Sequence, residues 1–410
     1  MNYLCRNCGN TLGVQDVVID LGHQPPSNSL LTEDQLYEPE TYYPLRVYLC
    51  QKCFLVQIPE TKASKEIFNS AYPYYSSESP ANVSHAKEYV EMMAKKFKIK
   101  GPGKRVLEIG SNDGYLLQWF KGSECNVLGI DPAGGPVEKA KEKGIPTIKG
   151  FFRKGYVREY DQPFDLICSI NTIAHQPDIH DFVGGMRIAL APRGIITAEF
   201  PHLLELLKKV QFDTIYHEHY SYFSFKVIKD IFFKNGLSIF RVEKLPEHGG
   251  SLRIFAAHNN SCPWIEASVD DLVREEAKCG LDSSFSPYSR LSWKRDKIID
   301  HFADFLVNIP CDYSLCAYGA AAKASTFFNC CGSLVTRRIS FVVDRSPYKQ
   351  GKFLPGSHLR ITDEDTLKKA EPEYVLITAW NLKDEIMKQL SYIRKWGGKF
   401  VVAIPKLEVL

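Results

Sequence analysis

A strand, a glycine-rich turn and a helix follow one another at residues 106–120. Residues 106–109 read as a buried strand, and the next five residues are Gly-Ser-Asn-Asp-Gly. Residues 115–120 then have the apolar spacing of a helix. A glycine turn between a strand and a helix lets backbone N–H groups approach a ligand closely. The sequence therefore predicts a doubly wound α/β domain with a ligand at this turn.

The next predicted strand, 126–130, ends in Asp131 and Pro132. In doubly wound folds, an acid about 20 residues after the first turn binds a ribose diol. The glycines do not spell G-x-G-x-x-G, which disfavours a cofactor with a pyrophosphate. Acids at both strand ends suit a cationic cofactor that carries a ribose, as S-adenosylmethionine does, although acids at chance positions in an ordinary turn are the alternative. The predicted contacts in these turns are Glu108, Gly110, Asn112, Asp113, Asp131 and Pro132.

With 410 residues, the chain is too long for one hydrophobic core, which predicts two or three domains. Its 44% apolar and 24% charged residues are typical of an ordinary globular protein. A net charge of +3 gives no indication of nucleic-acid or membrane binding. We find neither an apolar run long enough to cross a bilayer nor a secretory signal pattern. We therefore expect a cytoplasmic protein whose 12 cysteines are mostly reduced thiols or metal ligands.

Two C-x-x-C pairs occur in the first 65 residues, Cys5 with Cys8 and Cys50 with Cys53. Four thiolates from two such pairs make a closed tetrahedral Zn²⁺ site with no position left for a substrate. The metal is therefore expected to be structural, because so small a module has too little core to fold alone. A pair of disulfides and buried free thiols are the alternatives.

Residues 69–80 are rich in tyrosine and serine and contain two prolines, so they fit neither a helix nor an alternating strand. Tyr72, Tyr74 and Tyr75 either line a polar pocket or belong to a linker. A helical run at 81–100 follows and leads through a Gly-Pro-Gly hinge to the strand at 106.

Two later strands of the central domain carry candidate ligand contacts at their ends. The strand at 146–152 ends in Phe151 and Phe152, whose rings either stack on an adenine or belong to the core. The strand at 164–170 runs into Asn171 and His175, which are expected at the cleft beyond the carboxyl ends of the strands. The other predicted elements of this domain are helices at 137–143 and 182–189 and strands at 194–200 and 252–257.

The sequence Asp-Thr-Ile-Tyr-His-Glu-His-Tyr-Ser-Tyr-Phe at 213–223 is unusually rich in groups that transfer protons. A histidine beside a carboxylate can have a pKa near neutrality, as a general base requires. Metal binding by His217 and His219 ranks lower because no H-E-x-x-H spacing is present, and a structural aromatic cluster ranks last. On a strand, the two histidines would share one face.

The sequence His-Gly-Gly-Ser-Leu-Arg at 248–253 leads into the strand at 252–257. Its small residues either let a ligand approach the backbone or form a hairpin turn. Ser251 and Arg253 are predicted substrate contacts within it.

The last third repeats the pattern of strand, small-residue turn and helix at 315–326, which predicts a second Rossmann-like unit. Lys323 lies in the turn, and Lys349 follows Asp344. These charges fit a phosphate group at a helix N-terminus, whereas a docking domain with solvated lysines is the alternative. Further strands are predicted at 341–344, 374–378 and 399–404.

These motifs occur in an order that resembles one known family. They are the two C-x-x-C pairs, Leu-Glu-Ile-Gly-Ser-Asn-Asp-Gly at 107–114, Tyr-His-Glu-His at 216–219, the turn at 248–253, and Asp344 followed by Lys-Gln-Gly and Pro-Gly at 349–356. The chain resembles the nucleotide-sugar 3-C-methyltransferases of deoxysugar pathways over nearly its whole length. The resemblance implies an α/β protein in three parts: a zinc-binding module at 1–65, a class I S-adenosylmethionine methyltransferase domain at 66–300, and a Rossmann-like nucleotide-sugar-binding domain at 301–410.

The resemblance also implies an activity, methylation of C-3 in a dTDP-linked or GDP-linked 4-keto-deoxysugar. His219 is the implied base, assisted by Glu218 and Tyr216. His175 is a further implied active-site residue, and either Tyr74 or Tyr75 is the functional tyrosine. We expect a monomer with no nucleic-acid or membrane partner. Methylation of a sugar oxygen or nitrogen, and a non-catalytic zinc-module binding protein, are the alternatives.

Overall fold

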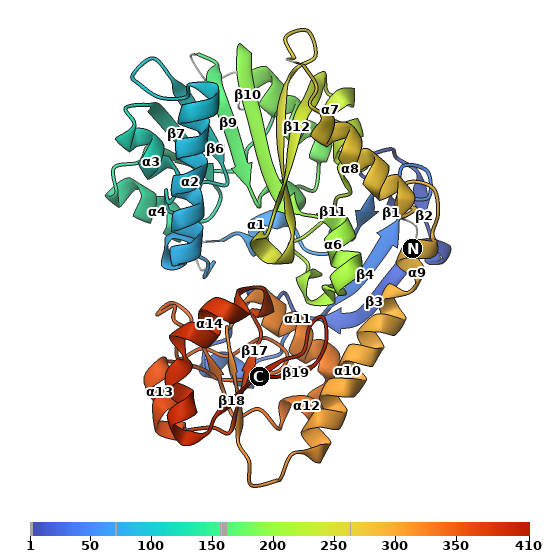
Figure 1. Ribbon diagram of the computed structural model, residues 1–410, viewed down its shortest axis with the longest axis vertical. Coiled ribbons are helices and arrows are strands. Elements are labelled where there is room, and N and C mark those ends of the chain that lie inside the picture. The colour runs from blue at the N-terminus through green and yellow to red at the C-terminus, as the bar shows by residue number, and fades with distance from the viewer. Residues whose placement is uncertain (1–2, 70–71, 156, 158–161, 263) are drawn as a thin grey trace.

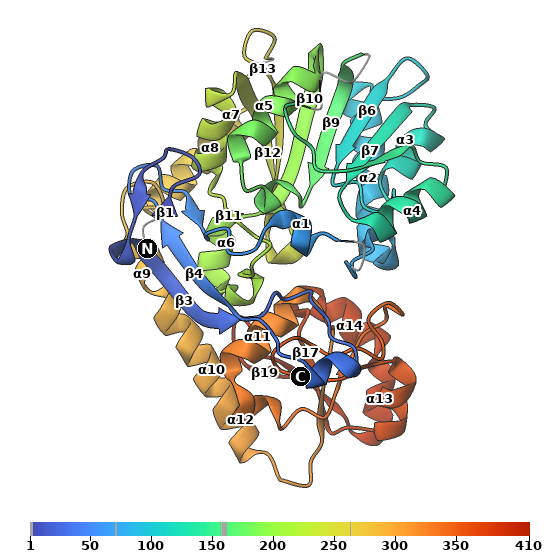
Figure 2. The ribbon, with the colours of Figure 1, turned by 180° about the vertical axis from the view of Figure 1, so that it is seen from behind.

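The computed structural model describes residues 3–69, 72–155, 157, 162–262 and 264–410. Ser70 and Ala71, in the tyrosine-rich stretch, lie outside the described residues. Two α/β lobes lie one above the other in Figure 1, and helix α10 (Leu291–Asn308) runs down one side of the lower lobe. Figure 2 shows that the long N-terminal strands β3 (Val17–Gln24) and β4 (Tyr43–Leu49) run along the same side.

The upper lobe contains a seven-stranded sheet in the order β12-β13-β10-β9-β6-β7-β8. The strands from β8 to β10 are parallel, and β13 is antiparallel to both of its neighbours. The central parallel strands β6 and β9 are almost wholly buried because helices cover both faces of the sheet. The predicted doubly wound domain is therefore confirmed. Its strands are β6 (Arg105–Ile109), β7 (Asn126–Asp131), β8 (Thr147–Lys149), β9 (Phe164–Ile170), β10 (Leu190–Pro201), β12 (Leu237–Leu245) and β13 (Ser251–His258).

Helix α2 (Pro80–Phe97) leads into this sheet. The Ser79 hydroxyl accepts a hydrogen bond from the Asn82 N–H, and Pro80 occupies the first helical position, so the start of the helix is well defined. The helix ends three residues before the predicted 100 because Lys98 adopts a left-handed backbone conformation, with φ of 59°. The other helices of the lobe are α3 (Leu117–Gly122), α4 (Gly134–Glu142), α5 (Ile179–Ala189), α6 (Leu203–Lys209), α7 (Phe225–Lys234) and α8 (Ala267–Lys278).

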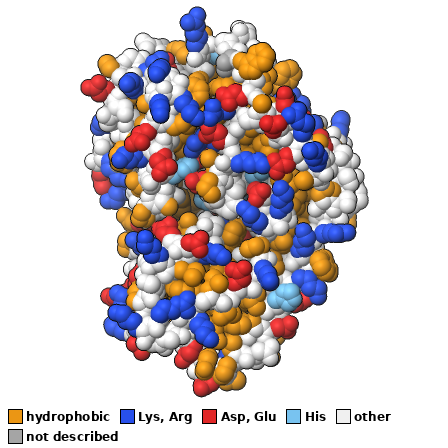
Figure 3. Space-filling model, viewed as in Figure 1, with side chains coloured by type: hydrophobic (Ala, Val, Ile, Leu, Met, Phe, Trp, Pro, Cys, Tyr) orange, Lys and Arg blue, Asp and Glu red, His pale blue; other side chains and the backbone are white. Residues whose placement is uncertain are grey.

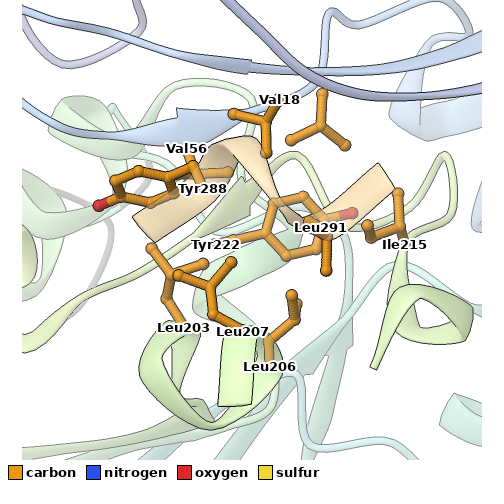
Figure 4. A pocket seen from close by; sticks show the side chains of 10 residues that line it. Val18, Val56, Leu203, Leu206, Leu207, Ile215, Tyr222, Tyr288 and Leu291 are labelled. Atoms are coloured by element: carbon orange, nitrogen blue, oxygen red, sulfur yellow. The ribbon is translucent and has the colours of Figure 1, made fainter. Parts of the chain in front are cut away.

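The N-terminal module shares a sheet with the upper lobe. Strand order in this sheet is β11-β5-β4-β3, and β11 (Ser221–Tyr222) lies within the sequence at 213–223 that is rich in proton-transfer groups. Figure 4 shows Val18 and Val56 of the module facing Leu203, Leu206 and Leu207 of α6, with Tyr222 and Tyr288 between them. The core is therefore continuous between the module and the rest of the protein. The module's remaining strands are β1 (Tyr3–Leu4), β2 (Thr11–Leu12) and β5 (Val56–Gln57).

The lower lobe is the second Rossmann-like unit that the sequence predicts. Its sheet has the order β16-β15-β14-β17-β18-β19, and only β19 is antiparallel to its neighbour. Position 300, where the sequence places a domain boundary, lies inside α10. The strands are β14 (Leu315–Tyr318), β15 (Val342–Val343), β16 (Ile361–Thr362), β17 (Tyr374–Ile377), β18 (Lys399–Val402) and β19 (Glu408–Val409), and the helices are α11 (Ala322–Cys331), α12 (Ser333–Thr336), α13 (Glu364–Ala370) and α14 (Lys383–Gln389).

Basic and acidic side chains are interspersed over the face of the molecule in Figure 3, as the small net charge suggests. Among the described residues, no helix combines the length and the apolar character that a membrane crossing requires.

Candidate active site

A cleft of about 380 Å³ lies between the carboxyl ends of the upper sheet and the lower lobe. It brings together most of the predicted site residues although they lie far apart in the sequence. Those that line it are Tyr74, Gly110, Asn112, Asp131, Pro132, Phe151, Phe152, Asn171, His175, Tyr216, Glu218, His219, Lys323 and Lys349. The predicted residues Tyr75, Glu108, Asp113, Ser251 and Arg253 are not part of its lining.

The turn after β6 forms one end of the cleft. The Asn112 and Ala133 N–H groups each donate a hydrogen bond to the carboxylate of Asp131, over 2.9 and 2.8 Å. Burial raises the pKa of Asp131 to about 6, and these two hydrogen bonds partly oppose the shift. Asn112 also accepts from the Ser76 N–H and donates to the Tyr74 carbonyl oxygen, so the tyrosine-rich segment is tied to this turn.

Glu108 lies beneath the turn, fully buried in β6. Neither of its carboxylate oxygens has a hydrogen-bond partner among the described residues. Burial, together with the nearby Asp131 and Asp113, raises its pKa well above the ordinary value. Asp113 is engaged elsewhere, because it accepts hydrogen bonds from Ser77 and from Lys143.

The two phenylalanines after β8 differ in their environment. Strand β8 ends at Lys149, before both rings, so the predicted strand to residue 152 is too long. Phe152 is buried and packs edge-on against Phe182 at 5.7 Å, whereas Phe151 is half-buried. Both contribute to the cleft wall.

The sequence at 215–220 forms an irregular loop with a turn at 217–218, so His217 and His219 do not share the face of a strand. Two hydrogen bonds fix the shape of this loop. The Thr326 hydroxyl donates to the Ile215 carbonyl, and the His219 N–H donates to the Tyr216 carbonyl. His217 is directed away from the cleft, with its Nε2 3.3 Å from the Tyr43 carbonyl oxygen. His219 lines the cleft instead.

Hydrogen bonds fix the tautomer of His219. Its Nδ1 lies 2.9 Å from the Thr214 carbonyl oxygen, which can only accept, so Nδ1 carries the proton. Its Nε2 therefore accepts from the Tyr216 hydroxyl, also at 2.9 Å. Burial first, and then the neighbouring His175, lower the pKa of His219 well below its ordinary value. His219 is thus a neutral imidazole joined to a tyrosine hydroxyl at the edge of the cleft.

Two side chains other than the neighbouring histidines hold the Glu218 carboxylate. Asn28 of the N-terminal module donates to Oε1 over 2.7 Å, and the Tyr72 hydroxyl donates to Oε2 over 3.0 Å. Burial raises the pKa of Glu218 to about 7, against the opposing effect of these hydrogen bonds. The Glu218 carbonyl oxygen accepts from Nδ1 of His175, whose pKa burial lowers to about 4.

Of the two predicted functional tyrosines, Tyr74 lines the cleft, and its hydroxyl accepts from Asn82 over 3.1 Å. Tyr75 stacks on Tyr348 of the lower lobe, with ring centroids 4.2 Å apart. Tyr72, which the sequence analysis placed in the same segment without choosing it, is the tyrosine bound to Glu218.

A charged network in the wall of the cleft includes His85, a histidine to which no local sequence pattern pointed. His85 of α2 lies 2.7 Å from Glu199 and 3.1 Å from Glu247. Burial opposes the charged imidazole, but these two carboxylates outweigh it and raise the pKa of His85 to about 9. Arg253 donates to the same Glu199 over 2.6 Å, and the Ser251 hydroxyl donates to the Glu247 carbonyl. Both predicted substrate contacts therefore support the wall of the cleft from behind.

The lower lobe contributes two lysines to the cleft. Nζ of Lys323 donates to Asn381 over 2.9 Å and lies 4.6 Å from the centre of the Trp380 ring. Burial lowers its pKa. Lys349 pairs with Asp344 over 3.2 Å. Both lysines lie near the N-terminus of α11, which begins at Ala322.

The four predicted metal ligands form one cluster in the N-terminal module. Their sulfur atoms all lie within 4.8 Å of one another, with Cys5 to Cys53 and Cys8 to Cys50 at 3.5 Å. All four are free thiols, so the disulfide alternative is wrong. Four sulfur ligands with no open position fit a structural Zn²⁺ ion.

The chain matches three family models in succession. These describe a zinc binding domain at residues 5–68, a methyltransferase domain at 84–242 and a C-methyltransferase C-terminal domain at 246–405. The C-methyltransferase NovU of Streptomyces niveus is 31% identical over 410 residues, covering 99% of this chain and 96% of NovU. The chain belongs to this C-methyltransferase family. The family resemblance inferred from the motifs is thereby confirmed, and this C-methyltransferase is an S-adenosylmethionine-dependent enzyme with a zinc-binding module.

Other relatives match a smaller part of the C-methyltransferase. A ubiquinone biosynthesis O-methyltransferase of Bradyrhizobium is 30% identical over 99 residues, which cover 23% of this chain and 38% of that protein. The crystal structure of magnesium protoporphyrin IX methyltransferase from Synechocystis, with bound S-adenosylmethionine, covers 49% of this chain and all of its own, at 12% identity and a TM-score of 0.37.

The residues of the β6 turn fit the methyl donor of the C-methyltransferase. Glu108 is a buried carboxylate whose oxygens lack partners, which is costly unless a donor or a cation is close. Asp131 lies at the carboxyl end of β7 and faces the cleft, where a ribose diol could reach its oxygens. A cofactor with a ribose therefore suits Asp131, whereas Glu108 lies beneath the turn and outside the lining of the cleft.

Proposed function

We propose that this methyltransferase removes the C-3 proton of a nucleotide-linked 4-keto-deoxysugar and methylates C-3. One observation carries the proposal: a set of proton-transfer groups lies in the same cleft as the donor turn and two lysines. A carbon next to a ketone becomes a nucleophile only after it loses a proton, so C-methylation requires a base. When bound, S-adenosylmethionine supplies an electrophilic methyl group.

The Tyr216–His219 pair is the proposed base. His219 is neutral, and its Nε2 lone pair accepts the Tyr216 proton as the phenolic oxygen takes the proton from C-3. An ionised Glu218 favours a proton on this pair, because its negative charge contributes to the raised pKa of Tyr216 after the larger effect of burial. The Tyr74 hydroxyl, which accepts from Asn82, keeps its own proton available for the oxygen on C-4.

The two lysines are the proposed site of the nucleotide diphosphate. Lys323 and Lys349 provide positive charge beside the N-terminus of α11, where backbone N–H groups attract anions. A sugar held by its diphosphate at the lower lobe would reach across the cleft to Tyr216 and His219. We propose a dTDP- or GDP-linked sugar as the substrate and a monomer as the active form.

Solvent exchange tests the proposed reaction. In D₂O without the methyl donor, the enzyme should exchange the C-3 hydrogen of a nucleotide-linked 4-keto-deoxysugar for deuterium, because proton removal precedes methyl transfer. The same nucleotide sugar with the ketone reduced to an alcohol should not exchange. Methyl transfer to both compounds without any exchange would indicate methylation of oxygen or nitrogen instead.

Asp131→Ala should weaken donor binding by about 1–3 kcal/mol, because it removes a buried acceptor that we place at the ribose. Calorimetric titration with S-adenosylhomocysteine measures this loss. Asp165→Ala is the matched control, since Asp165 lies near the start of strand β9, is not part of the cleft lining and bonds to Lys104. Equal affinities in both variants would remove Asp131 from the donor site.

The pH dependence of turnover should reflect Glu218. Its folded-state pKa of about 7 means that the carboxylate becomes charged as the pH rises through 7. We therefore expect kcat/KM to increase about tenfold per pH unit below 7 and to level off above it. In Glu218→Gln this increase should disappear, because His219 and His175 already lose their protons at lower pH. If kcat/KM of the variant still increases up to pH 7, a group other than Glu218 causes this pH dependence.

A further inference from the structure

The side chain of Asn28 comes from the zinc module but reaches the cleft of the two other parts. Asn28 lies between β3 and the short helix at Asp34–Tyr37, and it lines the cleft. Its Nδ2 is 2.7 Å from Glu218, 190 residues away in the sequence. Glu218 is only 1% exposed, so few donors can reach it. Among the described side chains, Asn28 and Tyr72 donate to its carboxylate.

The backbone around Asn28 is clamped to the lower lobe. The Ser27 carbonyl accepts from the Ser325 hydroxyl over 2.8 Å, and the Ser27 hydroxyl lies 3.2 Å from that of Thr326. Leu31 and Phe353 exchange two backbone hydrogen bonds of 3.0 and 2.8 Å. Thr326 also holds the Ile215 carbonyl of the loop that carries Glu218. The donor and the acceptor are thus fixed by the same helix, α11.

We propose that Asn28 is a positioning residue for Glu218: its side-chain amide holds the carboxylate toward the cleft and favours its ionised form. The inference rests on the proposed function, in which ionised Glu218 supports proton transfer to Tyr216 and His219. An amide N–H stabilises a carboxylate more than it stabilises the neutral acid, because the charged acceptor forms the stronger hydrogen bond. The zinc module therefore contributes directly to the active site.

Several other titratable groups face Glu218 and must be held constant in the test. They are Tyr72 and Lys62 from the segment before α2, His175 from the loop after β9, and Tyr216 and Tyr220 from its own loop. Replacing Asn28 leaves all of them in place. A change in the titration of Glu218 in such a variant is therefore attributable to the lost amide.

The titration of Glu218 can be followed in the full-length, substrate-free protein. Infrared difference spectra detect the carbonyl stretch of the protonated acid, and Glu218→Gln identifies the band. In Asn28→Ala the titration midpoint of Glu218 should rise by about one pH unit, because its carboxylate loses one charge-assisted hydrogen bond. Asn28→Asp should raise it further by adding a like charge, and the pH limb of kcat/KM should move in parallel.

Ser27→Ala is the matched control, because it loosens the same segment without removing a donor to Glu218. In this control the midpoint of Glu218 should stay at the wild-type value, and Asn28→Gln, which keeps an amide, should shift the midpoint less than Asn28→Ala does. An unchanged midpoint in Asn28→Ala, or an equal shift in Ser27→Ala, would overturn the positioning role. The infrared measurement needs no substrate, so this result is independent of whether the proposed sugar is methylated.

Discussion

His219→Asn should lower the turnover number by a factor of roughly 10²–10⁴ while donor binding stays close to wild type. Asparagine can replace the Nδ1 hydrogen bond to the Thr214 carbonyl, but it has no counterpart of the Nε2 atom that accepts from Tyr216. The loop should therefore keep its shape while the proton acceptor is lost. Single-turnover assays with calorimetry of S-adenosylhomocysteine separate the two effects.

His217→Asn is the matched control for this result. His217 is also buried in the loop, but it lies against Tyr43 of the N-terminal module and does not line the cleft. It should retain most of the turnover. If His219→Asn still exchanges the C-3 hydrogen with solvent while Glu218→Gln or Tyr216→Phe does not, the proton goes to another group and His219 is a substrate contact.

Cys50→Ser should produce a protein that loses its zinc and aggregates or unfolds at a markedly lower temperature. Zinc contributes roughly 10–16 kcal/mol to the folding of small zinc-finger peptides, and a serine hydroxyl cannot replace a thiolate. Cys50 is fully buried in a hydrophobic cluster that the module shares with the upper lobe, so its replacement also disturbs this packing. Metal analysis and thermal unfolding followed by circular dichroism measure both consequences.

The metal prediction has a simple control and a clear contrary outcome. Cys311 is an exposed thiol outside the cluster, so Cys311→Ser should keep close to one zinc ion per chain and the wild-type unfolding temperature. A stable and active Cys50→Ser protein without metal would contradict the four-thiolate site.

Local sequence patterns predict the sheets of this protein well. The strand expected at 164–170 is the observed β9, because a parallel strand covered on both faces is an almost continuous apolar run. The turn after β6 and the metal-binding cysteines can also be predicted from local patterns. The glycines indicate the turn, and the C-x-x-C spacing indicates the metal site. The position of Asp131 at the cleft follows from the same rule about strand ends.

Contacts between distant segments could not be predicted in this way. The loop at 215–220 departs from a strand because Thr326 and Tyr43, far away in sequence, hold its carbonyl and imidazole groups. His85 occupies a helix position with no local sign of function, yet it pairs with Glu199. The sequence around Asn28 gives no sign of a role in the active site either, because its partner Glu218 lies 190 residues away.

The position of the transferred methyl group tests the central proposal most directly. The enzyme can be incubated with S-adenosylmethionine labelled with ¹³C in the methyl group and with dTDP-, GDP- and UDP-linked 4-keto-deoxysugars. The proposal predicts that NMR spectra of one product show the labelled methyl bonded to C-3 and the C-3 proton missing. A labelled methyl on oxygen or nitrogen, or no transfer to any of these 4-keto sugars, would contradict it.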